Sequence, residues 1–368
     1  MVTDLEAMRR ALQLAARARG HTSPNPMVGA VIVSGGRIVG EGYHHRAGEP
    51  HAEVHALREA GRRARGSALY VTLEPCAHYG RTPPCTDAII AAGVSRVIAA
   101  GRDPSPKVNG KGFRLLREAG LAVEAGLLAE EAARLNEFYF TFVRAGRPFV
   151  SLKLALSLDG KIATASGESR CITGPAARRF VHRLRSWHDA VMVGIGTALA
   201  DDPRLTVRHV RSRRQPRRVI VDSRLRLPAT ARVLKGDPPP IIITTDKAPA
   251  TRARRLEATG AEIVSTPVRD GRVDPAAALK ELGRRSITSV LLEGGAELAA
   301  AALAAGVVDK LYFFLAPRLI GGASSPGAIG GAGIARLSDA VRLTDVRVRR
   351  VGEDLLVEAY PVRKAGRR

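Results

Sequence analysis

The sequence predicts an α/β protein built from two domains. Strand-like and helix-like segments alternate along most of its 368 residues, and this alternation is typical of a sheet covered by helices. The length is sufficient for two domains of ordinary size, each with its own core. A stretch with glycine and proline, Arg144-Ala145-Gly146-Arg147-Pro148, lies between two such alternating patterns. We therefore expect one domain over residues 1–146 and a second over residues 147–368.

The first domain is expected to begin with a helix over residues 1–20, because Thr3 and Glu6 can form a capping box ahead of an amphipathic pattern. The apolar run over residues 27–33 predicts a buried strand, and Gly35-Gly36 predicts the hairpin turn that follows it. The remaining elements alternate in type: a strand over 37–40, a helix starting near His51, a strand over 68–73, a loop with two cysteines, a helix over 86–92, a strand over 96–100, and helices over 112–119 and 130–143.

The second domain is expected to open with an apolar strand over residues 149–155. A helix over 175–186 then leads into a strand over 190–194. The further elements repeat this alternation without an internal sequence repeat. Strands are predicted over 218–222, 240–244, 261–264, 288–292, 310–315 and 355–360, and helices over 250–258, 275–283 and 296–305.

The formal net charge of +23 raises the question of a nucleic-acid partner. Nucleic-acid binding usually shows as a concentrated basic patch, often with aromatic residues for base stacking. Here the 58 basic residues are spread over the whole chain, only nine of them are lysines, and aromatic residues make up 4%. The charge therefore reflects a compositional bias toward arginine, and we expect no nucleic-acid partner, although some arginines can hold phosphates of small substrates.

Hydropathy and cysteine content indicate a cytoplasmic protein without a membrane segment. No apolar run approaches the roughly 20 residues that span a bilayer, and the N-terminus lacks the apolar core of a signal peptide. Three cysteines in a chain of this length cannot form a disulfide scaffold. In a reducing compartment they remain available for metal binding.

The clearest chemical signal is the motif His51-Ala52-Glu53, followed by the pairs Pro75-Cys76 and Pro84-Cys85. One imidazole and two thiolates make a three-ligand zinc site that leaves a fourth position open to water. Glu53 is then expected to act as general acid and base, taking a proton from the water and delivering it to the leaving ammonia. The same arrangement is typical of zinc nucleobase deaminases, so we expect one Zn²⁺ ion per chain.

Two other interpretations of these residues remain open. A purely structural zinc normally has four protein ligands, and no third cysteine lies nearby in the sequence. His55 follows His51 by four residues, so a helical pair of histidines could bind a metal instead. Because two thiolates already complete the predicted set, His55 is better interpreted as a residue that supports the ligands without binding the metal, or as a packing residue. The roles of His44, His45 and His78 are ambiguous.

The spacing of the two cysteines departs from the C-x-x-C that closes the usual deaminase signature, because Cys76 and Cys85 are nine positions apart. The segment 77–84 between them must fold back on itself, and glycine and prolines in it favour such a turn. With this stretch, Pro-Cys-Ala-His-Tyr-Gly-Arg-Thr-Pro-Pro-Cys, the domain resembles the deaminase domain of the bifunctional riboflavin-biosynthesis deaminase/reductase family. The resemblance implies a cytidine-deaminase-like three-layer αβα fold. It also implies substrate contacts at Asn25 and Asn109, although either asparagine could simply build a turn.

A series of motifs in the second domain resembles the reductase domain of the same family. It begins with Ser157-Leu158-Asp159-Gly160 after the first strand and ends with Glu293-Gly294-Gly295-Ala296. Between them, in order, lie residues 166–169, 172–174, 194–197 and 201–208. The resemblance implies a dihydrofolate-reductase-like α/β fold, and with the first domain included it covers nearly the whole chain.

A nucleotide site is also indicated by the residues themselves. The strand 288–292 ends in glycines ahead of a helix, and such a helix N-terminus favours a phosphate group. The motif is not GxGxxG, which disfavours a Rossmann domain. By resemblance, the NADPH contacts are Ala155, Cys171, Thr197, Asp201, Ser223, Gly295, Ala296, Glu297, Leu298, Ala299, Ala300 and Ala301. By resemblance, the substrate contacts are Ser169, Arg185, Leu205, Arg208 and Glu293.

Several of these residues could have a different role from the one that the resemblance implies. Arg185 and Arg208 are suited to clamp a ribose phosphate, because a guanidinium matches phosphate in a bidentate way, but either could lie on a solvated face. Lys153 is expected to orient or protonate the sugar, or else to extend from a strand end into solvent. Asp201 could cap a turn. Cys171 stands where many relatives have an aromatic residue beside the cofactor, and a cysteine cannot stack on nicotinamide.

The resemblance implies two successive reactions. The first is hydrolytic deamination of 2,5-diamino-6-ribosylamino-4(3H)-pyrimidinone 5′-phosphate, and the second is NADPH-dependent reduction of its ribosyl group to the ribityl side chain. We expect a homodimer formed through the reductase domain, with a phosphorylated pyrimidine as the partner molecule. The alternatives are a transfer-RNA deaminase with a basic C-terminal domain, and a binding protein with a degraded reductase half.

Overall fold

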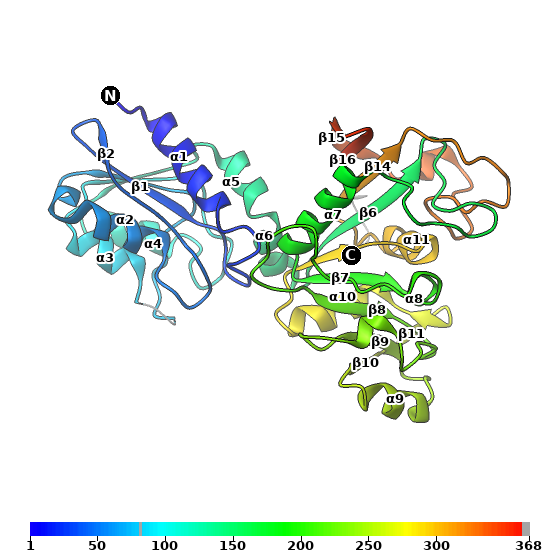
Figure 1. Ribbon diagram of the computed structural model, residues 1–368. Coiled ribbons are helices and arrows are strands. Elements are labelled where there is room, and N and C mark those ends of the chain that lie inside the picture. The colour runs from blue at the N-terminus through cyan, green and yellow to red at the C-terminus, as the bar shows by residue number, and fades with distance from the viewer. Residues whose placement is uncertain (81–82, 363–368) are drawn as a thin grey trace. The chain divides into compact units, whose positions relative to one another are not determined.

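A computed structural model describes residues 1–80 and 83–362 of the chain (Figure 1). Contacts within the chain divide it into two units, Met1–Gly146 and Arg147–Arg368, each with an α/β fold. This architecture confirms the predicted fold class. Among the described residues, no helix combines the length and the apolar character that crossing a membrane requires.

The first unit contains a mixed five-stranded sheet in the order β2-β1-β3-β4-β5. The hairpin of β1 and β2 is antiparallel, β3 pairs antiparallel with β1, and β4 and β5 continue parallel to β3. The strands are β1 (Gly29–Ser34), β2 (Arg37–Tyr43), β3 (Ala68–Val71), β4 (Arg96–Ala99) and β5 (Ala122–Ala125). The helices are α1 (Asp4–Ala16), α2 (Ala52–Ala60), α3 (Cys85–Ala91), α4 (Lys111–Glu118), α5 (Ala129–Leu135) and α6 (Glu137–Ala145), with a 3₁₀ turn at Gly61–Ala64.

Helices cover both faces of this sheet and produce three layers (Figure 1). On one face, α1 packs Ala7, Met8 and Ala11 against alternate residues of β1, β3 and β4. On the other face, α2, α3 and α4 bury a second apolar layer that includes Ile89 and Leu116. The central strands β1, β3 and β4 therefore bury both of their sides, which matches the near-continuous apolar runs in the sequence.

Helix α2 lies directly on strand β2, because two glycines of the strand leave no space for a side chain. A Cβ atom at Gly40 would lie 2.2 Å from the carbonyl oxygen of Ala56, and one at Gly42 would lie 2.3 Å from that of Ala52. The close approach of the two backbones fixes the position of the N-terminus of α2 relative to the sheet.

The second unit contains a nine-stranded sheet in the order β10-β9-β8-β7-β13-β6-β14-β16-β15. The strands from β10 to β14 run parallel, and β16 and β15 are added in antiparallel fashion. The strands are β6 (Phe149–Ser157), β7 (Ala190–Gly194), β8 (Arg217–Val221), β9 (Ile241–Thr245), β10 (Glu262–Thr266), β13 (Ser289–Leu292), β14 (Lys310–Ala316), β15 (Leu343–Val351) and β16 (Asp354–Pro361), with a separate hairpin of β11 (Val268–Arg269) and β12 (Arg272–Val273).

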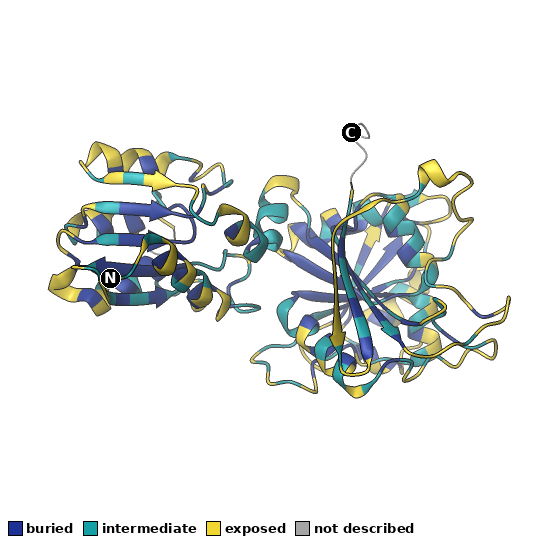
Figure 2. Cartoon of the chain, turned by 90° about the horizontal axis from the view of Figure 1, so that it is seen from above, coloured by how far each residue is buried: buried dark blue, intermediate teal, exposed yellow. Residues whose placement is uncertain are grey.

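Helices cover this sheet on both faces, and the buried strands form the centre of the unit (Figure 2). On one face α10 and α11 pack on the sheet, and on the other α7, α8 and α9 do so. These helices are α7 (Pro175–Trp187), α8 (Ile195–Asp201), α9 (Ala250–Glu257), α10 (Pro275–Arg284) and α11 (Ala296–Ala304), with 3₁₀ turns at Arg232–Leu234 and Leu337–Asp339.

Several elements differ from the predictions. The helix predicted over 130–143 is two helices, because Asn136 leaves the helical conformation and its side chain bonds the backbone N–H and C=O of Met27 at 2.8 and 2.9 Å. The first helix ends at Ala16, four residues before the predicted end. Strands β5 and β15 and helix α8 were not predicted. Both strands are largely exposed, so they lack the apolar runs that predict a buried strand.

Candidate functional site

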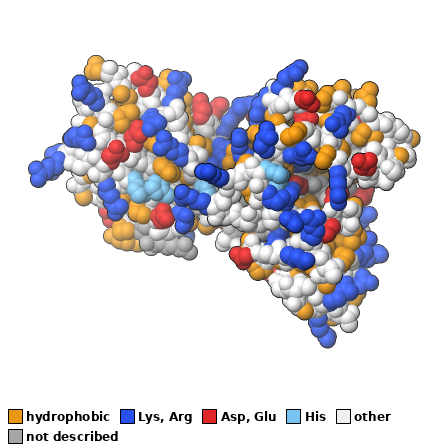
Figure 3. Space-filling model, viewed as in Figure 1, with side chains coloured by type: hydrophobic (Ala, Val, Ile, Leu, Met, Phe, Trp, Pro, Cys, Tyr) orange, Lys and Arg blue, Asp and Glu red, His pale blue; other side chains and the backbone are white. Residues whose placement is uncertain are grey.

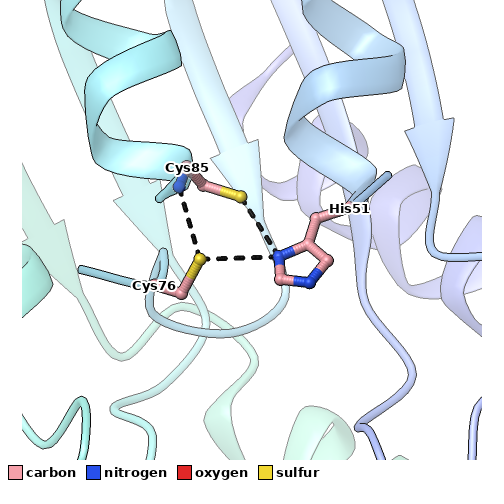
Figure 4. A group of neighbouring side chains, drawn as sticks. All are labelled: His51, Cys76 and Cys85. Carbon is pink, nitrogen blue, oxygen red and sulfur yellow. Dashed lines mark hydrogen bonds between the residues drawn. The ribbon is translucent and has the colours of Figure 1, made fainter. Parts of the chain in front are cut away.

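Three metal-ligating side chains of the first unit converge at one end of its sheet (Figure 4). The Nδ1 atom of His51 lies 3.5 Å from Sγ of Cys76 and 3.3 Å from Sγ of Cys85. The backbone N–H of Cys85 also donates to Sγ of Cys76, at 3.3 Å. All three ligand atoms lie within 4.8 Å of one another. The structure thus brings together the three residues that the sequence proposes as ligands.

The local folds explain why these residues meet. His51 is the N-cap of α2, and Cys85 is the first residue of α3, where Pro84 precedes it in an extended conformation. Cys76 lies in the loop that follows β3. The two cysteines thus enter the site from the start of α3 and from the loop that precedes it. The predicted turn between the two cysteines falls partly on Arg81 and Thr82, which lie outside the described residues.

The donor set and its spacing fit a zinc ion. Zinc bonds of about 2.3 Å to sulfur and about 2.0 Å to nitrogen place N and S ligands of a tetrahedral site about 3.5 Å apart. The two observed nitrogen–sulfur distances are 3.5 and 3.3 Å. A hydrogen bond from the Cys85 thiol and then the contact with His51 lower the pKa of Cys76 to about 4, so its thiolate form is favoured. Conversely, the Cys76 sulfur raises the pKa of Cys85 well above its ordinary value.

Glu53 lies in the first turn of α2, two residues after His51, and its side chain is buried. Its Oε2 atom has no hydrogen-bond partner among the described residues. Burial is the main cause that raises the pKa of Glu53 to about 7, and the nearby Cys76 sulfur is the second cause. A carboxylate with one free oxygen beside a metal centre can accept and return a proton.

A second histidine, His44, orients one of the two predicted substrate asparagines. Nε2 of His44 lies 3.1 Å from Nδ2 of Asn25, and its Nδ1 lies 3.2 Å from the carbonyl oxygen of Pro50. The ring can therefore donate to Pro50 and accept from the Asn25 amide, which leaves the Asn25 oxygen available. The His44 ring also packs edge-on against His51 at 5.0 Å. Sequence reasoning left His44 ambiguous, because nothing in its spacing identifies this contact.

Other histidines of the first unit lie apart from the three ligands. The ring of His55 stacks on that of His45 at a centroid distance of 4.5 Å, and its Nε2 atom is buried without a partner among the described residues. The cluster of three ligand atoms contains neither residue. His55 is therefore a packing residue in this structure, as the sequence interpretation preferred.

Asn109, the other predicted substrate asparagine, is exposed just before α4. Its backbone has a φ of 32°, and its carbonyl oxygen accepts a hydrogen bond from Arg102. The loop around Asn109 is held by Glu74, a buried carboxylate that sequence reasoning missed. The only sequence signal for Glu74 is an acidic residue directly after an apolar strand.

In the second unit, Arg185 and Glu293 form a buried bidentate ion pair. Nε and Nη2 of Arg185 lie 2.5 and 2.7 Å from the two oxygens of Glu293, and Nη1 donates to the carbonyl oxygen of Thr206 at 3.0 Å. Each of the three Arg185 nitrogens thus makes one hydrogen bond within the protein, and one further N–H group remains on both Nη1 and Nη2. The predicted contact of Arg185 with the substrate stays a prediction. Burial raises the pKa of Glu293, but Arg185 outweighs burial and the pKa is lowered overall.

Lys153 lies beside this ion pair because of the strand register. Leu152 of β6 pairs with Leu292 of β13, so Lys153 and Glu293 are the next residues on adjacent parallel strands. Burial lowers the pKa of Lys153, and Glu293 opposes that effect. Ligand sites of parallel α/β sheets lie at this carboxyl edge. Lys153 is thus a partly buried amine beside the Arg185–Glu293 pair, where β13 ends.

Two more predicted site residues are in direct contact. The hydroxyl of Ser169 donates to Oδ1 of Asp201 at 2.9 Å. Arg208 donates its backbone N–H to Nδ1 of His182 at 3.1 Å, and its Nη1 atom contacts the Thr206 hydroxyl at 2.9 Å. The Arg208 side chain is exposed, so its guanidinium can reach a phosphate from solvent.

Some of the remaining predicted cofactor residues make polar contacts, and the others are alanines of β6 and α11. Thr197 lies beside Gly295, at whose position a Cβ atom would be 3.1 Å from the Thr197 hydroxyl. The hydroxyl of Ser223 accepts the backbone N–H of Val273 at 3.1 Å. Glu297 accepts from Gly331 N–H and from Arg272, both at 3.0 Å. Ala155 lies on β6, and Ala296, Ala300 and Ala301 lie on α11.

Burial limits what some of the predicted residues can offer a ligand. Leu205 is 2% exposed and Ala299 is fully buried, so both belong to the core and can offer a ligand little besides their backbone. Leu298 is only partly buried and packs against the core from α11. Cys171 is exposed, with a φ of 61°, and its sulfur accepts a hydrogen bond from Arg178 at 2.8 Å. A thiol at this position offers no aromatic surface for stacking.

Basic side chains do not gather into one patch on the face of the molecule shown in Figure 3, where Lys and Arg are scattered among other residue types. Many arginines are instead bound to carboxylates, such as Arg10 to Glu41 and Arg147 to Asp309. The arrangement on that face lacks the concentrated basic surface that is typical of nucleic-acid binding.

Comparisons with known proteins agree with this architecture. Residues 1–100 match the family model described as "Cytidine and deoxycytidylate deaminase zinc-binding region", and residues 148–357 match the one described as "RibD C-terminal domain". The chain is 44% identical to riboflavin biosynthesis protein RibD of Aquifex aeolicus over 96% of this chain and 97% of that protein. It is also 44% identical to the RibD protein of Escherichia coli, over 95% of this chain and 96% of that protein.

Two solved structures are similar along the whole chain. The RibD protein of Acinetobacter baumannii (form 1) has a TM-score of 0.89 at 40% identity, with 98% of this chain and 99% of that chain covered. A diaminohydroxyphosphoribosylaminopyrimidine deaminase/5-amino-6-(5-phosphoribosylamino)uracil reductase of Thermotoga maritima has a TM-score of 0.86 at 37% identity, with the same coverage.

Proposed function

The chain belongs to the RibD family of riboflavin biosynthesis proteins, and on that premise we propose how its own residues serve the two reactions of the family. It is a bifunctional enzyme with a zinc-binding deaminase unit and a reductase unit that uses a nicotinamide cofactor. The alternative of a transfer-RNA deaminase has no support, because the second unit matches the RibD C-terminal domain instead of a nucleic-acid-binding domain.

We propose that the first unit deaminates the diaminopyrimidine ribosylamino 5′-phosphate, with His51, Cys76 and Cys85 holding one zinc ion. When bound there, zinc acts as a Lewis acid that activates the attacking water. Glu53 takes the proton of that water through its unpartnered Oε2 atom and returns it to the departing amino group. The observation that carries this proposal is the convergence of three ligand atoms beside a buried carboxylate with one free oxygen.

Substrate binding in this unit is assigned to Asn25 and Asn109. His44 fixes the Asn25 amide so that its oxygen can accept a hydrogen bond from an amino group of the pyrimidine. Asn109 is exposed in a loop held from two sides by Arg102 and Glu74, and its amide is free to bind a second polar edge of the ring. Two fixed amides orient a planar substrate better than one.

In the second unit we assign the reduction of the ribosyl group to the carboxyl edge of the nine-stranded sheet. When bound, NADPH supplies the hydride to C1′ of the sugar. Lys153 orients the sugar and donates a proton to the ring oxygen as the ring opens, while Glu293 stays paired with Arg185 and holds the lysine in place. Arg208 offers an exposed guanidinium to the 5′-phosphate. Thr197, Asp201, Ser223 and the start of α11 are assigned to the cofactor.

Assembly and location complete the proposal. The edge strand β15 is exposed along nearly its whole length and carries exposed Val346 and Val348, which supports a homodimer formed through the reductase unit. All three cysteines are free thiols, which suits the reducing conditions of the cytoplasm.

One incubation tests the function. Zinc-loaded protein is given the pyrimidine phosphate with and without NADPH, while ammonia and the absorbance of NADPH are followed together. We expect ammonia release in both samples and NADPH oxidation that begins only as deaminated product accumulates. Ammonia release from transfer RNA alone, or cofactor binding without oxidation, would contradict the proposal.

A further inference from the structure

Glu74 joins the loop of a metal ligand to the loop that carries Asn109. Glu74 lies three residues after the end of β3 at Val71, and it is 4% exposed. Its Oε2 atom accepts the backbone N–H groups of Asp103 and Gly110 at 3.2 and 2.9 Å. Its Oε1 atom accepts those of Gly112 and Phe113 at 3.0 and 3.4 Å. A single carboxylate thus binds four backbone donors.

The contacts of Glu74 replace a missing helix cap. The N-cap of α4 is Gly110, which has a φ of 89° and no side chain that could accept a hydrogen bond. Gly112 and Phe113 are the second and third residues of this helix, whose N–H groups a capping side chain normally binds. Glu74 accepts both, and its negative charge also suits the helix N-terminus. The start of α4 is therefore defined by a residue from another part of the chain.

The segment that carries Glu74 leads directly into a metal-ligand residue and packs against the start of α4. Glu74 precedes Cys76 by two residues, and a Cβ atom at Gly112 would lie 2.1 Å from the carbonyl oxygen of the intervening Pro75. The backbones of the two loops are in direct contact, so neither can shift without the other. On its other side, Asn109 is held by Arg102, which donates to the Asn109 carbonyl oxygen.

We propose that Glu74 is a positioning residue of the deaminase reaction, which holds Asn109 at a fixed place relative to the metal-ligand loop. This inference rests on the proposed function, in which Asn109 binds the pyrimidine. Glu74 itself touches neither ligand atoms nor substrate and acts through the backbone of Gly110. A residue that served only stability would leave substrate affinity unchanged once the protein is folded.

The substitution Glu74→Gln tests the role with almost no change of shape. The glutamine amide places an NH₂ group where an oxygen accepted two backbone N–H groups, so two donors face two donors. We expect KM for the pyrimidine to rise about tenfold, as for the loss of one substrate hydrogen bond, with kcat changed less than about threefold. Zinc content and the reductase rate measured with deaminated substrate should stay at wild-type values.

Glu41→Gln is the control, because Glu41 is a partly buried carboxylate of the same unit that also accepts N–H groups, those of Arg10. It should leave KM unchanged. Equal KM values for the two variants and the wild type would overturn the proposal. If Glu74→Gln fails to fold, Arg102→Met removes the other support of Asn109 from an exposed position and should raise KM in the same direction.

A double-mutant cycle separates this inference from the proposed function. If Glu74 acts through Asn109, Glu74→Gln should add little to the KM of the Asn109→Ala variant. Additive effects would show that Glu74 acts elsewhere and would overturn the inference while the role of Asn109 stands. A wild-type KM for Asn109→Ala would instead remove the substrate role of Asn109, and the inference would fall with it.

Discussion

Arg185 and Glu293 face each other as two parallel N–H···O contacts of 2.5 and 2.7 Å, although 108 positions separate them in the sequence. Their side chains are only 11% and 7% exposed. A buried ion pair is costly to break from one side, because the remaining charge loses its partner in a poorly solvated place. This pair therefore couples the stability of the second unit to the geometry around Lys153.

Replacing Glu293→Gln should impair both stability and reduction. The neutral amide leaves the Arg185 charge uncompensated, so we expect a loss of about 3 kcal/mol in the free energy of unfolding of the second unit and at least a tenfold lower rate of NADPH oxidation. Trp187, the single tryptophan, lies in this unit and reports its unfolding by fluorescence in urea. Glu281→Gln, which breaks surface pairs with Arg284 and Arg285, should cost less than about 1 kcal/mol. Equal costs for the two variants would contradict the argument.

Replacing Glu53→Gln should abolish proton transfer without disturbing the metal ligands. We expect ammonia release to fall by about 10² to 10⁴, since general acid–base catalysis contributes that range. Zinc content by elemental analysis and reduction of deaminated substrate should not change. Glu59→Gln, at the exposed end of the same helix, should retain wild-type deamination. A Glu53→Gln protein that still releases ammonia at the normal rate would refute the acid–base role.

His188 should make the second unit less stable as the pH falls from about 6.5 to about 4. Burial lowers the pKa of His188 to about 4 from an ordinary value of 6.5, while its two ring nitrogens contact Leu184 O and Ser151 Oγ, both at 2.8 Å. Above pH 6.5 the ring is neutral in both the folded and the unfolded protein, so its full contribution to the free energy of unfolding is present. Below 6.5 the unfolded chain gains a proton that the folded protein does not, so stability falls, by about 3 kcal/mol in total at pH 4.

Urea unfolding followed at Trp187 between pH 4 and pH 7 measures this effect. Other groups also titrate in this range, so the comparison is with His188→Gln, whose amide keeps a donor and an acceptor but has no charge to gain. The variant should show a shallower loss of stability with acid than the wild type. Parallel curves for the two proteins would rule out His188 as a source of the pH dependence.

Strand β15 should provide the contact between two copies of the chain. Val348 is 60% exposed on this edge strand, and a lysine there would place a charge in a dimer interface. We expect Val348→Lys to convert a dimer into a monomer in light scattering after size-exclusion chromatography. Ile38→Lys, at an exposed apolar position of the first unit, should leave the dimer intact. A monomeric wild-type protein would contradict the proposed assembly.

The metal ligands were the part of the site that could be predicted most directly from the sequence. Imidazole and thiolate ligands have few other uses in such a spacing, so His51, Cys76 and Cys85 could be selected from residue type alone. Glu74 could not, since its role depends on backbone N–H groups of residues 103–113, and backbone groups leave no trace in a sequence. The roles of the individual site residues remain predictions.

In the second unit, too, some features could be predicted from the sequence and others could not. Buried parallel strands such as β7 and β13 were predicted, because both of their faces are apolar. Strand β15 was missed, because Val346 and Val348 alternate with arginines and the strand contributes almost nothing to the core. The burial of Leu205 was missed as well, since its φ of 52° turns the chain inward at a place where neighbouring polar residues suggest a surface loop.

The glycines under α2 limit how the deaminase half can diverge. With the backbone oxygens of Ala52 and Ala56 at 2.3 and 2.2 Å from where a methyl group at Gly42 or Gly40 would stand, even alanine would lift the helix away from the sheet. His51 and Glu53 sit at the start of that helix and would be displaced with it. Neither glycine is a residue of the proposed site. Substitution of either one is nevertheless expected to damage catalysis as much as the loss of a metal ligand.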